Sequence, residues 1–142
     1  PLELEPFVRE VADFHKELAE RKRLYFALDI PAGFSVLSDK NLLAIVLRNL
    51  VDNAVKYTKA GHIHITAAAT DGEVSITIKD TGAGMSAAKI DELLSHRQNN
   101  GHKANSTYGY RLIVELAQLI QAGLQIESEI GKGTAVTLSF RM

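Results

Sequence analysis

Apolar side chains recur with two different periods along this chain, and the two periods separate expected helices from expected strands. In four stretches the apolar residues are three and four positions apart, which is the spacing of one helix face. The four expected helices cover residues 2–23, 40–57, 87–95 and 110–122. The apolar face of the first consists of Leu4, Phe7, Val8, Val11, Phe14, Leu18 and Ala19.

Three of these helices carry boundary signals in the sequence. Ser38 or Asp39 is a candidate N-cap for the second helix, because a short side-chain oxygen accepts hydrogen bonds from free N–H groups. Ser86 is a candidate N-cap for the third helix. Gly123 follows the fourth and is expected to end it.

Alternating apolar and polar residues mark the strands. Thr70-Asp71-Gly72 separates two alternating runs and predicts a tight hairpin turn. Gly131-Lys132-Gly133-Thr134 is interpreted as the turn of a closing hairpin. It does not fit a phosphate-binding P-loop, because Gly133 stands where that motif needs serine or threonine. The expected strands cover residues 24–31, 32–38, 62–70, 73–80, 124–130 and 135–140.

The order of these elements predicts an α+β fold. Residues 95–108 are mostly polar and are expected to form a mobile loop between the last two helices. Around that loop the order is helix, strand, short strand, helix, two strands, two helices and two strands. Successive hairpins favour one mostly antiparallel sheet, with the helices packed on one of its faces.

Composition narrows the class of protein. The chain has 142 residues, 46% of them apolar and 23% charged, which suits one globular domain. Its net charge of -1 lacks the basic excess of a nucleic-acid binder, and the absence of cysteine excludes disulfides and thiolate sites. No apolar run has membrane-spanning length, so no membrane contact by this domain is expected. Because the chain starts at Pro1 without methionine, we expect residues 1–142 to be one domain excised from a larger protein.

One helix carries a polar stripe. Asn49, Asn53, Lys56 and Tyr57 recur at helical spacing within an otherwise apolar segment. One interpretation is that the two amides are solvated or bond to nearby backbone. The other is that their oxygens point into a cleft and bind a hard cation such as Mg²⁺, which is usually shared with phosphate oxygens. Lys56 would then add positive charge near those phosphates.

A glycine-rich turn follows the strand that ends at Asp80. Gly82 and Gly84 permit close backbone approach to a ligand, and the Asp80 carboxylate can accept a hydrogen bond from an exocyclic amine. The alternative is a tight turn in which Asp80 bonds its own backbone. Asp-Thr-Gly is also the signature of aspartic proteases, but those proteins are nearly all strands, and this motif leads into a helix.

Together, "NLVDNAVKYT", "DTGAGM" and "GKGT" closely resemble the N box and two glycine boxes of the ATP-binding catalytic domain of sensor histidine kinases. That family belongs to the superfamily of gyrase B, Hsp90 and MutL. The resemblance implies a two-layer α/β sandwich of the Bergerat type, with a mixed, mostly antiparallel five-stranded sheet and three main helices on one face. It also implies a cytoplasmic domain, free or as part of a membrane-bound sensor.

The resemblance also implies roles for residues and partners. Mg-ATP would be the cofactor, with Asn53 and Asn49 at the metal and Asp80 holding the adenine amino group. The γ-phosphate would pass to a histidine on a dimerisation domain outside this chain, and from there to a response regulator. The other nucleotide-binding residues implied are Lys56, Tyr57, Gly82, Gly84, Met85, Lys103, Gly109 and Thr134.

The chain also departs from the family pattern. ATP-hydrolysing relatives place a glutamate where Asn49 stands, and an amide cannot act as a general base. Of the second glycine box only Gly109 remains, within residues 105–110. Two alternatives therefore stay open: a degenerate pseudokinase used as an interaction domain, and a serine kinase of the anti-sigma-factor type. His62 and His64 lie on one strand face, where solvent exposure explains them better than zinc.

Overall fold

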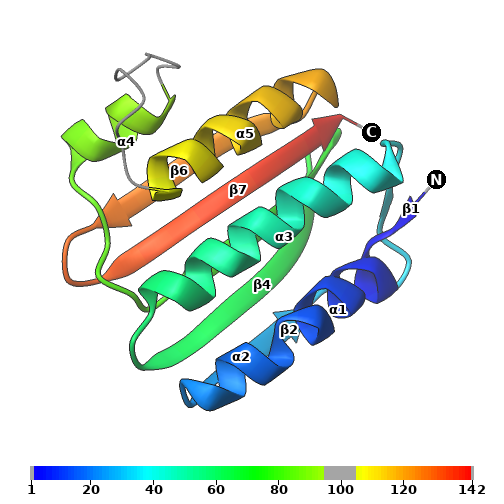
Figure 1. Cartoon of the computed structure of the whole chain (residues 1–142). Coiled ribbons are helices and arrows are strands. Elements are labelled where there is room, and N and C mark those ends of the chain that lie inside the picture. Colours follow the sequence, from blue (N-terminus) through cyan, green and yellow to red (C-terminus); the bar gives the residue numbers. More distant parts are fainter. Residues whose placement is uncertain (1, 95–104, 142) are drawn as a thin grey trace.

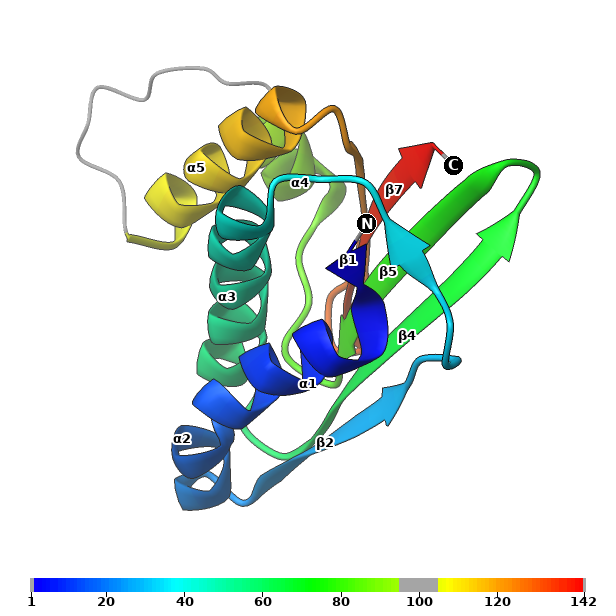
Figure 2. The same ribbon diagram turned by 90° about the vertical axis from the view of Figure 1, so that its right-hand side faces the viewer.

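The protein is described by a computed structural model that covers residues 2–94 and 105–141. A five-stranded sheet with the order β2-β4-β5-β7-β6 forms one layer (Figures 1 and 2). Strands β2 and β4 are parallel and every other neighbouring pair in this sheet is antiparallel, as expected. The strands of the sheet are β2 (Leu24–Asp29), β4 (Gly61–Thr70), β5 (Glu73–Asp80), β6 (Gly123–Glu129) and β7 (Gly133–Arg141).

The helices cover one face of this sheet, and Figure 2 shows the two layers from the side. The three longer helices carry the apolar faces that the periodicity predicts, and they bury them against the sheet. The predicted two-layer α+β fold with three main helices on one face is therefore confirmed. The helices are α1 (Leu4–Phe14), α2 (Lys16–Arg21), α3 (Lys40–Tyr57), α4 (Ala87–Leu94) and α5 (Asn105–Leu119).

Alternation along β5 and β7 decides which side chains face the helices. In β5 the residues Val74, Ile76 and Ile78 are buried, and Asp80 continues the same face two positions further on. The neighbouring strand β7 begins its buried face at Thr134. Two polar side chains are therefore directed into the space between sheet and helices, where apolar residues would otherwise continue the core.

The first predicted helix is wrong in its continuity. It is two helices, α1 and α2, separated at His15, whose φ is -101° and ψ is 4°. The His15 ring is buried, and its Nδ1 lies 3.1 Å from the Val11 carbonyl oxygen. Two predicted core residues lie outside the core: Phe14, the last residue of α1, is 68% exposed, and Leu18 in α2 is 42% exposed. Phe14 instead packs under the Arg48 guanidinium, 5.0 Å from the ring centroid.

A second, two-stranded sheet lies at the N-terminus, and the sequence pattern predicts only one of its two strands. Strand β1 (Leu2–Glu3) pairs antiparallel with β3 (Ser35–Val36). The short strand expected within residues 32–38 corresponds to β3, while the sequence predicts residues 2–3 as part of the first helix. This pairing ties the start of α1 to the segment that leads into α3.

Helix α3 has the predicted bounds, and both of its ends are held by side chains. Asp39 is the N-cap, and its Oδ1 accepts a hydrogen bond of 2.9 Å from the Leu42 N–H. At the other end the Lys22 ammonium donates to the Val55 and Lys56 carbonyl oxygens, at 2.5 Å and 3.0 Å. An ammonium at the C-terminus is favoured by the helix dipole, so these bonds stabilise the end of α3, the helix that carries Asn49 and Asn53.

Both ends of the last helix differ from the prediction. Helix α5 begins at Asn105, so residues 105–108 are helical, although the sequence predicts them as part of the preceding loop. The rest of that predicted loop, residues 95–104, lies outside the described residues. At the other end, Gln121 and not Gly123 takes the left-handed conformation, with φ of 59°. The N–H of Ala122 then reaches the Ala117 carbonyl at 2.8 Å, and Gly123 opens β6.

Candidate functional site

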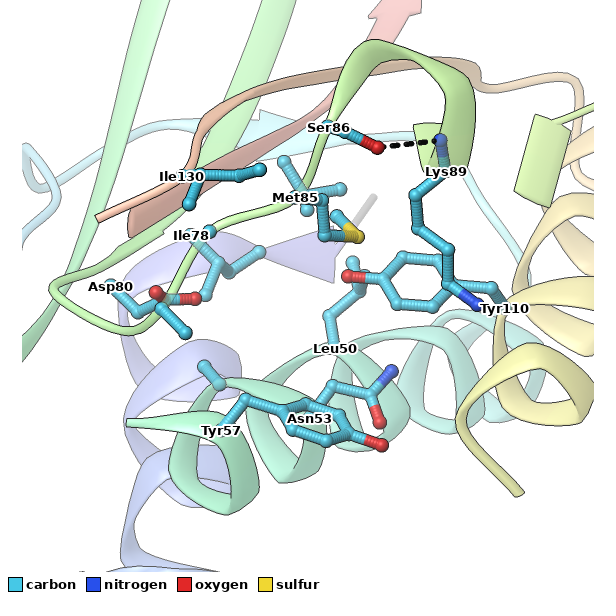
Figure 3. A pocket seen from close by; sticks show the side chains of 14 residues that line it. Leu50, Asn53, Tyr57, Ile78, Asp80, Met85, Ser86, Lys89, Tyr110 and Ile130 are labelled. Carbon is cyan, nitrogen blue, oxygen red and sulfur yellow. Dashed lines mark hydrogen bonds between the residues drawn. The ribbon is translucent and has the colours of Figure 1, made fainter. Parts of the chain in front are cut away.

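A cavity of about 450 Å³ opens between the C-terminal half of α3 and the ends of β5 and β7 (Figure 3). Its floor is apolar, while a few polar side chains enter from its walls. Such a mixture of apolar surface and convergent polar groups is typical of a small-molecule site. It is lined by Leu50, Asn53, Ala54, Tyr57, Ile78, Asp80, Ala83, Gly84, Met85, Ser86, Lys89, Tyr110, Ile130 and Val136.

Asp80 is the buried acid of this cavity. Its Oδ1 accepts hydrogen bonds from the backbone N–H of Gly82 at 2.8 Å and of Thr134 at 3.3 Å. Because both bonds go to one oxygen, the other carboxylate oxygen remains available to a ligand. Burial raises the pKa of Asp80 above its usual value, and the two backbone hydrogen bonds partly offset that rise.

Gly82 lets the chain pass close to the end of α3. A Cβ at this position would lie 2.6 Å from the Tyr57 carbonyl oxygen and 2.9 Å from Asp80 Oδ1. No side chain fits there without moving the backbone. The glycine therefore keeps the loop after β5 against the helix that carries Asn53.

Gly84 brings the same loop against the turn between β6 and β7. Its φ is +78°, and a Cβ would lie 2.0 Å from the Glu129 carbonyl oxygen. The neighbouring Ala83 carbonyl accepts a hydrogen bond of 2.6 Å from the Gly131 N–H. The loop that follows Asp80 and the closing hairpin thus form one wall of the cavity.

A hydroxyl network behind this wall joins residues far apart in sequence. Ser128 Oγ accepts from the Met85 N–H at 2.7 Å and donates to the Gly133 carbonyl at 2.9 Å. It also lies 2.8 Å from Thr134 Oγ1. Thr134 and Met85 were predicted as site residues and Ser128 was not, since only the register of β6 and β7 places it opposite Thr134.

Asn53 lies across the cavity from Asp80 (Figure 3). It is 9% exposed, and its Nδ2 is buried without a hydrogen-bond partner in the part of the chain that the structure describes. An unpaired buried amide is costly and is usually explained by a ligand, an ion or a water. Tyr57, on the next turn of α3, is 42% exposed and lines the rim of the cavity.

The rest of the predicted polar stripe does not line the cavity. Asn49 is half-buried and its Nδ2 donates to the Ile45 carbonyl at 2.7 Å. Lys56 is exposed, with its Nζ 5.7 Å from the centroid of the Tyr57 ring. At about 100° per residue, both positions fall roughly 40° to 60° outside the arc that contains the lining residues of α3.

The remaining predicted residues lie elsewhere. Lys103 is outside the described residues, and Gly109 lies in the first turns of α5. His62 and His64 are half-buried on the face of the sheet away from the helices. The ring of Tyr25 stacks on that of His62, with 5.4 Å between the ring centroids. Within residues 2–94 and 105–141, no group of three or more histidine, cysteine or acidic residues is arranged to hold a metal.

Among the lining residues that were not predicted as site residues, Lys89 and Tyr110 carry the longest polar side chains. Lys89 enters the cavity from α4 and Tyr110 enters it from α5. The sequence places Tyr110 only at the end of the altered second glycine box. The pattern of apolar and polar residues in α5 could have indicated that Tyr110 faces inward. It could not have shown that Tyr110 meets the cavity, because that depends on where the helix lies on the sheet.

Comparison with known proteins agrees with this geometry. Residues 38–142 match the family described as histidine kinase-, DNA gyrase B- and HSP90-like ATPase. The chain is 28% identical over 144 residues to the sensor protein BceS of Bacillus subtilis, covering 98% of this chain and 42% of BceS. It is 34% identical over 113 residues to the histidine protein kinase DivJ of Caulobacter vibrioides, covering 76% of this chain and 19% of DivJ.

Solved structures show the same fold. Full-length ShkA in complex with AMPPNP superimposes with a TM-score of 0.84 at 26% identity, over 99% of this chain and 30% of ShkA. The catalytic domain of the histidine kinase ThkA gives a TM-score of 0.83 at 17% identity and is covered to 94%. The chain spans less than half the length of BceS and of DivJ.

The chain belongs to the histidine kinase-, DNA gyrase B- and HSP90-like ATPase family. Within it, the relatives above are named as a sensor protein and a histidine protein kinase, and the expected ATP-binding domain of the histidine kinase type is confirmed. Among the described residues, no helix is long and apolar enough to cross a membrane.

Proposed function

We propose that this domain binds Mg-ATP in the cavity between Asp80 and Asn53 and supplies the γ-phosphate to a histidine outside this chain. The observation that carries the proposal is the placement of a buried carboxylate and an unpaired buried amide on facing walls of one apolar cavity. The two come from separate motifs, and the fold brings both to the same side of the sheet.

Asp80 supports recognition of adenine. Its free oxygen can accept a hydrogen bond from the exocyclic amine of adenine, while guanine presents a carbonyl at the corresponding position. Two backbone N–H groups fix the other oxygen, so the carboxylate cannot rotate to avoid a mismatched base. The apolar side chains of Ile78 and Val136 provide a floor on which a flat ring can lie.

Asn53 supports a magnesium ion bound together with phosphates. An amide offers a neutral oxygen ligand, which suits Mg²⁺ already neutralised by a triphosphate. Its buried amide nitrogen lacks a partner among the described residues, so the side chain is free to be oriented by what fills the cavity. Such an ion would be held through Asn53. Asn49, one turn earlier on α3, lies outside the cavity lining, so its oxygen is proposed as a further ligand only for an ion bound at the cavity rim.

The triphosphate would extend toward the first turns of α5. Helix N-termini bind anions because their first N–H groups are unpaired and the helix dipole is positive there. Tyr110 places these turns at the cavity wall, although only Gly109 of the second glycine box remains. Lys56, Lys103 and Lys89 are the basic side chains proposed to approach the phosphates.

The phosphoryl acceptor and the later partners belong to the proposal as well. We infer that residues 1–142 are one domain of a larger cytoplasmic or membrane-attached sensor, with the acceptor histidine on a dimerisation domain and a response regulator downstream. Phosphotransfer to histidine needs positioning and charge neutralisation, and it does not need a general base at position 49. The location in the cytoplasm follows from the proposed substrate, since ATP is supplied there.

Titration calorimetry with ATP and GTP in the presence of Mg²⁺ tests this function. We expect ATP to bind more tightly than GTP, and Asp80→Asn to weaken ATP binding at least tenfold, because a charged hydrogen bond contributes about 1.5–3 kcal/mol. Asp29→Asn is the matched control, because Asp29 is an exposed carboxylate on β2, outside the cavity. Absence of ATP binding at millimolar concentration, or equal effects of both variants, would overturn the proposal.

A further inference from the structure

Tyr110 contributes a further polar group to the cavity, and the proposed function assigns no role to its hydroxyl. It lies in α5, opposite the sheet, and is 6% exposed. Figure 3 shows its hydroxyl pointing into the cavity, with Asp80 on the other side. The ring is thus packed in the protein while the oxygen faces the space a ligand would fill.

The hydroxyl of Tyr110 lacks a protein partner in the described part of the chain. Its neighbours in the wall, Leu50 and Met85, present apolar side chains to the cavity. Because the hydroxyl faces the cavity, a ligand that displaces water from it must offer a hydrogen bond in return or lose affinity. The partner of this hydroxyl is therefore to be sought in the ligand.

The phenol is neutral at and around pH 7. Burial raises the pKa of Tyr110 to about 12, and the nearby Asp80 carboxylate acts in the same direction. A neutral phenol can both donate and accept a hydrogen bond. It therefore suits either a ring nitrogen or a sugar hydroxyl as its partner.

We propose that Tyr110 is a specificity-determining residue whose hydroxyl hydrogen-bonds the sugar edge of the bound purine nucleotide. The inference rests on the proposed function: Asp80 holds the amino group at one edge of the base. The edge of the nucleoside opposite that amino group then faces Tyr110 across the cavity. Two groups there have the required chemistry, the ring nitrogen N3 and the ribose 2′-hydroxyl.

The test compares Tyr110→Phe with wild type in titrations of ATP, 2′-deoxy-ATP and 3-deaza-ATP with Mg²⁺. Phenylalanine keeps the buried ring and removes only the hydroxyl, so the melting temperature of the nucleotide-free variant at pH 7 should be unchanged. The variant should bind ATP about three- to tenfold more weakly, the effect of one neutral hydrogen bond. With the analogue that lacks the partner atom, wild type and variant should bind equally.

Tyr25→Phe is the control, because Tyr25 is an exposed phenol on the edge strand β2, stacked on His62 and outside the cavity. It should bind all three nucleotides like wild type. Undiminished ATP binding by Tyr110→Phe would overturn this inference and leave the proposed function intact. The same loss with ATP and with both analogues would also overturn it, since the hydroxyl would then act elsewhere. If wild type itself does not bind ATP, the proposed function fails first and the inference with it.

Discussion

Asp80 and Thr134 are directly opposite each other on β5 and β7, and the Thr134 backbone N–H donates to Asp80 Oδ1 at 3.3 Å. Both residues are 9% exposed, at the ends of strands whose other inward residues are apolar. The sheet thus places a carboxylate where its pKa is raised by burial and where two N–H groups hold one of its oxygens. In the absence of a ligand, burying this charged carboxylate lowers the stability of the folded domain.

The first prediction concerns this loss of stability. Asp80→Asn keeps an oxygen that can accept from both N–H groups and removes the buried charge, so the nucleotide-free variant should be at least as stable as wild type at pH 7. The pKa of Asp80 is higher in the folded state than in the unfolded state, so the folded protein takes up the proton first as the pH falls. Between these two pKa values, falling pH therefore stabilises wild type relative to the variant. Urea unfolding of both proteins between pH 7 and pH 4 measures the difference. A variant much less stable than wild type at pH 7 would contradict it.

The second prediction concerns the hydroxyl behind the cavity wall. Ser128→Ala removes the acceptor of the Met85 N–H, a bond of 2.7 Å, and should lower the free energy of unfolding by about 1–2 kcal/mol. ATP binding should weaken as well, because the loop that carries Gly84 loses its attachment to β6. Ser139→Ala, on the opposite face of the same hairpin, is the control and should change neither quantity. Urea unfolding and nucleotide titration are the measurements, and equal effects of the two variants would contradict the role of Ser128.

The third prediction separates two glycines that both have positive φ. Gly84→Ala should cost about 3 kcal/mol, because its Cβ would lie 2.0 Å from the Glu129 carbonyl oxygen in addition to the backbone strain. Gly131→Ala should cost only about 1 kcal/mol, since φ is +86° but no atom lies within 4 Å of the new Cβ. Denaturant unfolding of the pair tests this. Similar losses in both variants would show that strain, and not the contact, explains the glycine at position 84.

The fourth prediction concerns alkaline pH. Burial raises the pKa of Tyr110 to about 12, from a usual value near 10. Below pH 10 Tyr110 is protonated in both the folded and the unfolded state, and its full contribution to the free energy of unfolding is present. Between about pH 10 and pH 12 that contribution is lost, because the unfolded chain releases the proton first. The loss should approach roughly 2–3 kcal/mol. Urea unfolding of wild type and of Tyr110→Phe at each pH separates this contribution from that of lysine titration, which both proteins share. Free energies of unfolding that fall in parallel for the two proteins would contradict the prediction.

The sequence predicted what depends on local pattern. Helix α3 has its expected bounds because Asp39 caps it and its apolar spacing is regular, and the hairpin at Asp71 and Gly72 forms because both residues adopt positive φ. Asp80 faces inward because it continues the alternation of β5. Each of these follows from residues close together in the chain.

What depends on distant contacts was not predicted. Ser128 is 43 positions from the Met85 N–H that it accepts from, and only strand register brings them together. The helical stripe indicated four site residues on α3, but the position of the sheet decides which part of it faces the cavity, and Asn49 and Lys56 fall outside. The expected stop at Gly123 was wrong because the capping bond of Ala122 to Ala117 stabilises the positive φ of Gln121.

Nuclear magnetic resonance of the domain during titration with Mg²⁺ and a non-hydrolysable ATP analogue tests the central claim most directly. The claim predicts that the largest shifts occur at the Asn53 side-chain amide, which lines the cavity, and at the backbone N–H of Gly82, which donates to Asp80 Oδ1. Residues on the far face of the sheet, such as His64, should be unaffected. Shifts that cluster away from Asn53 and Gly82, or no shifts at saturating analogue, would contradict it.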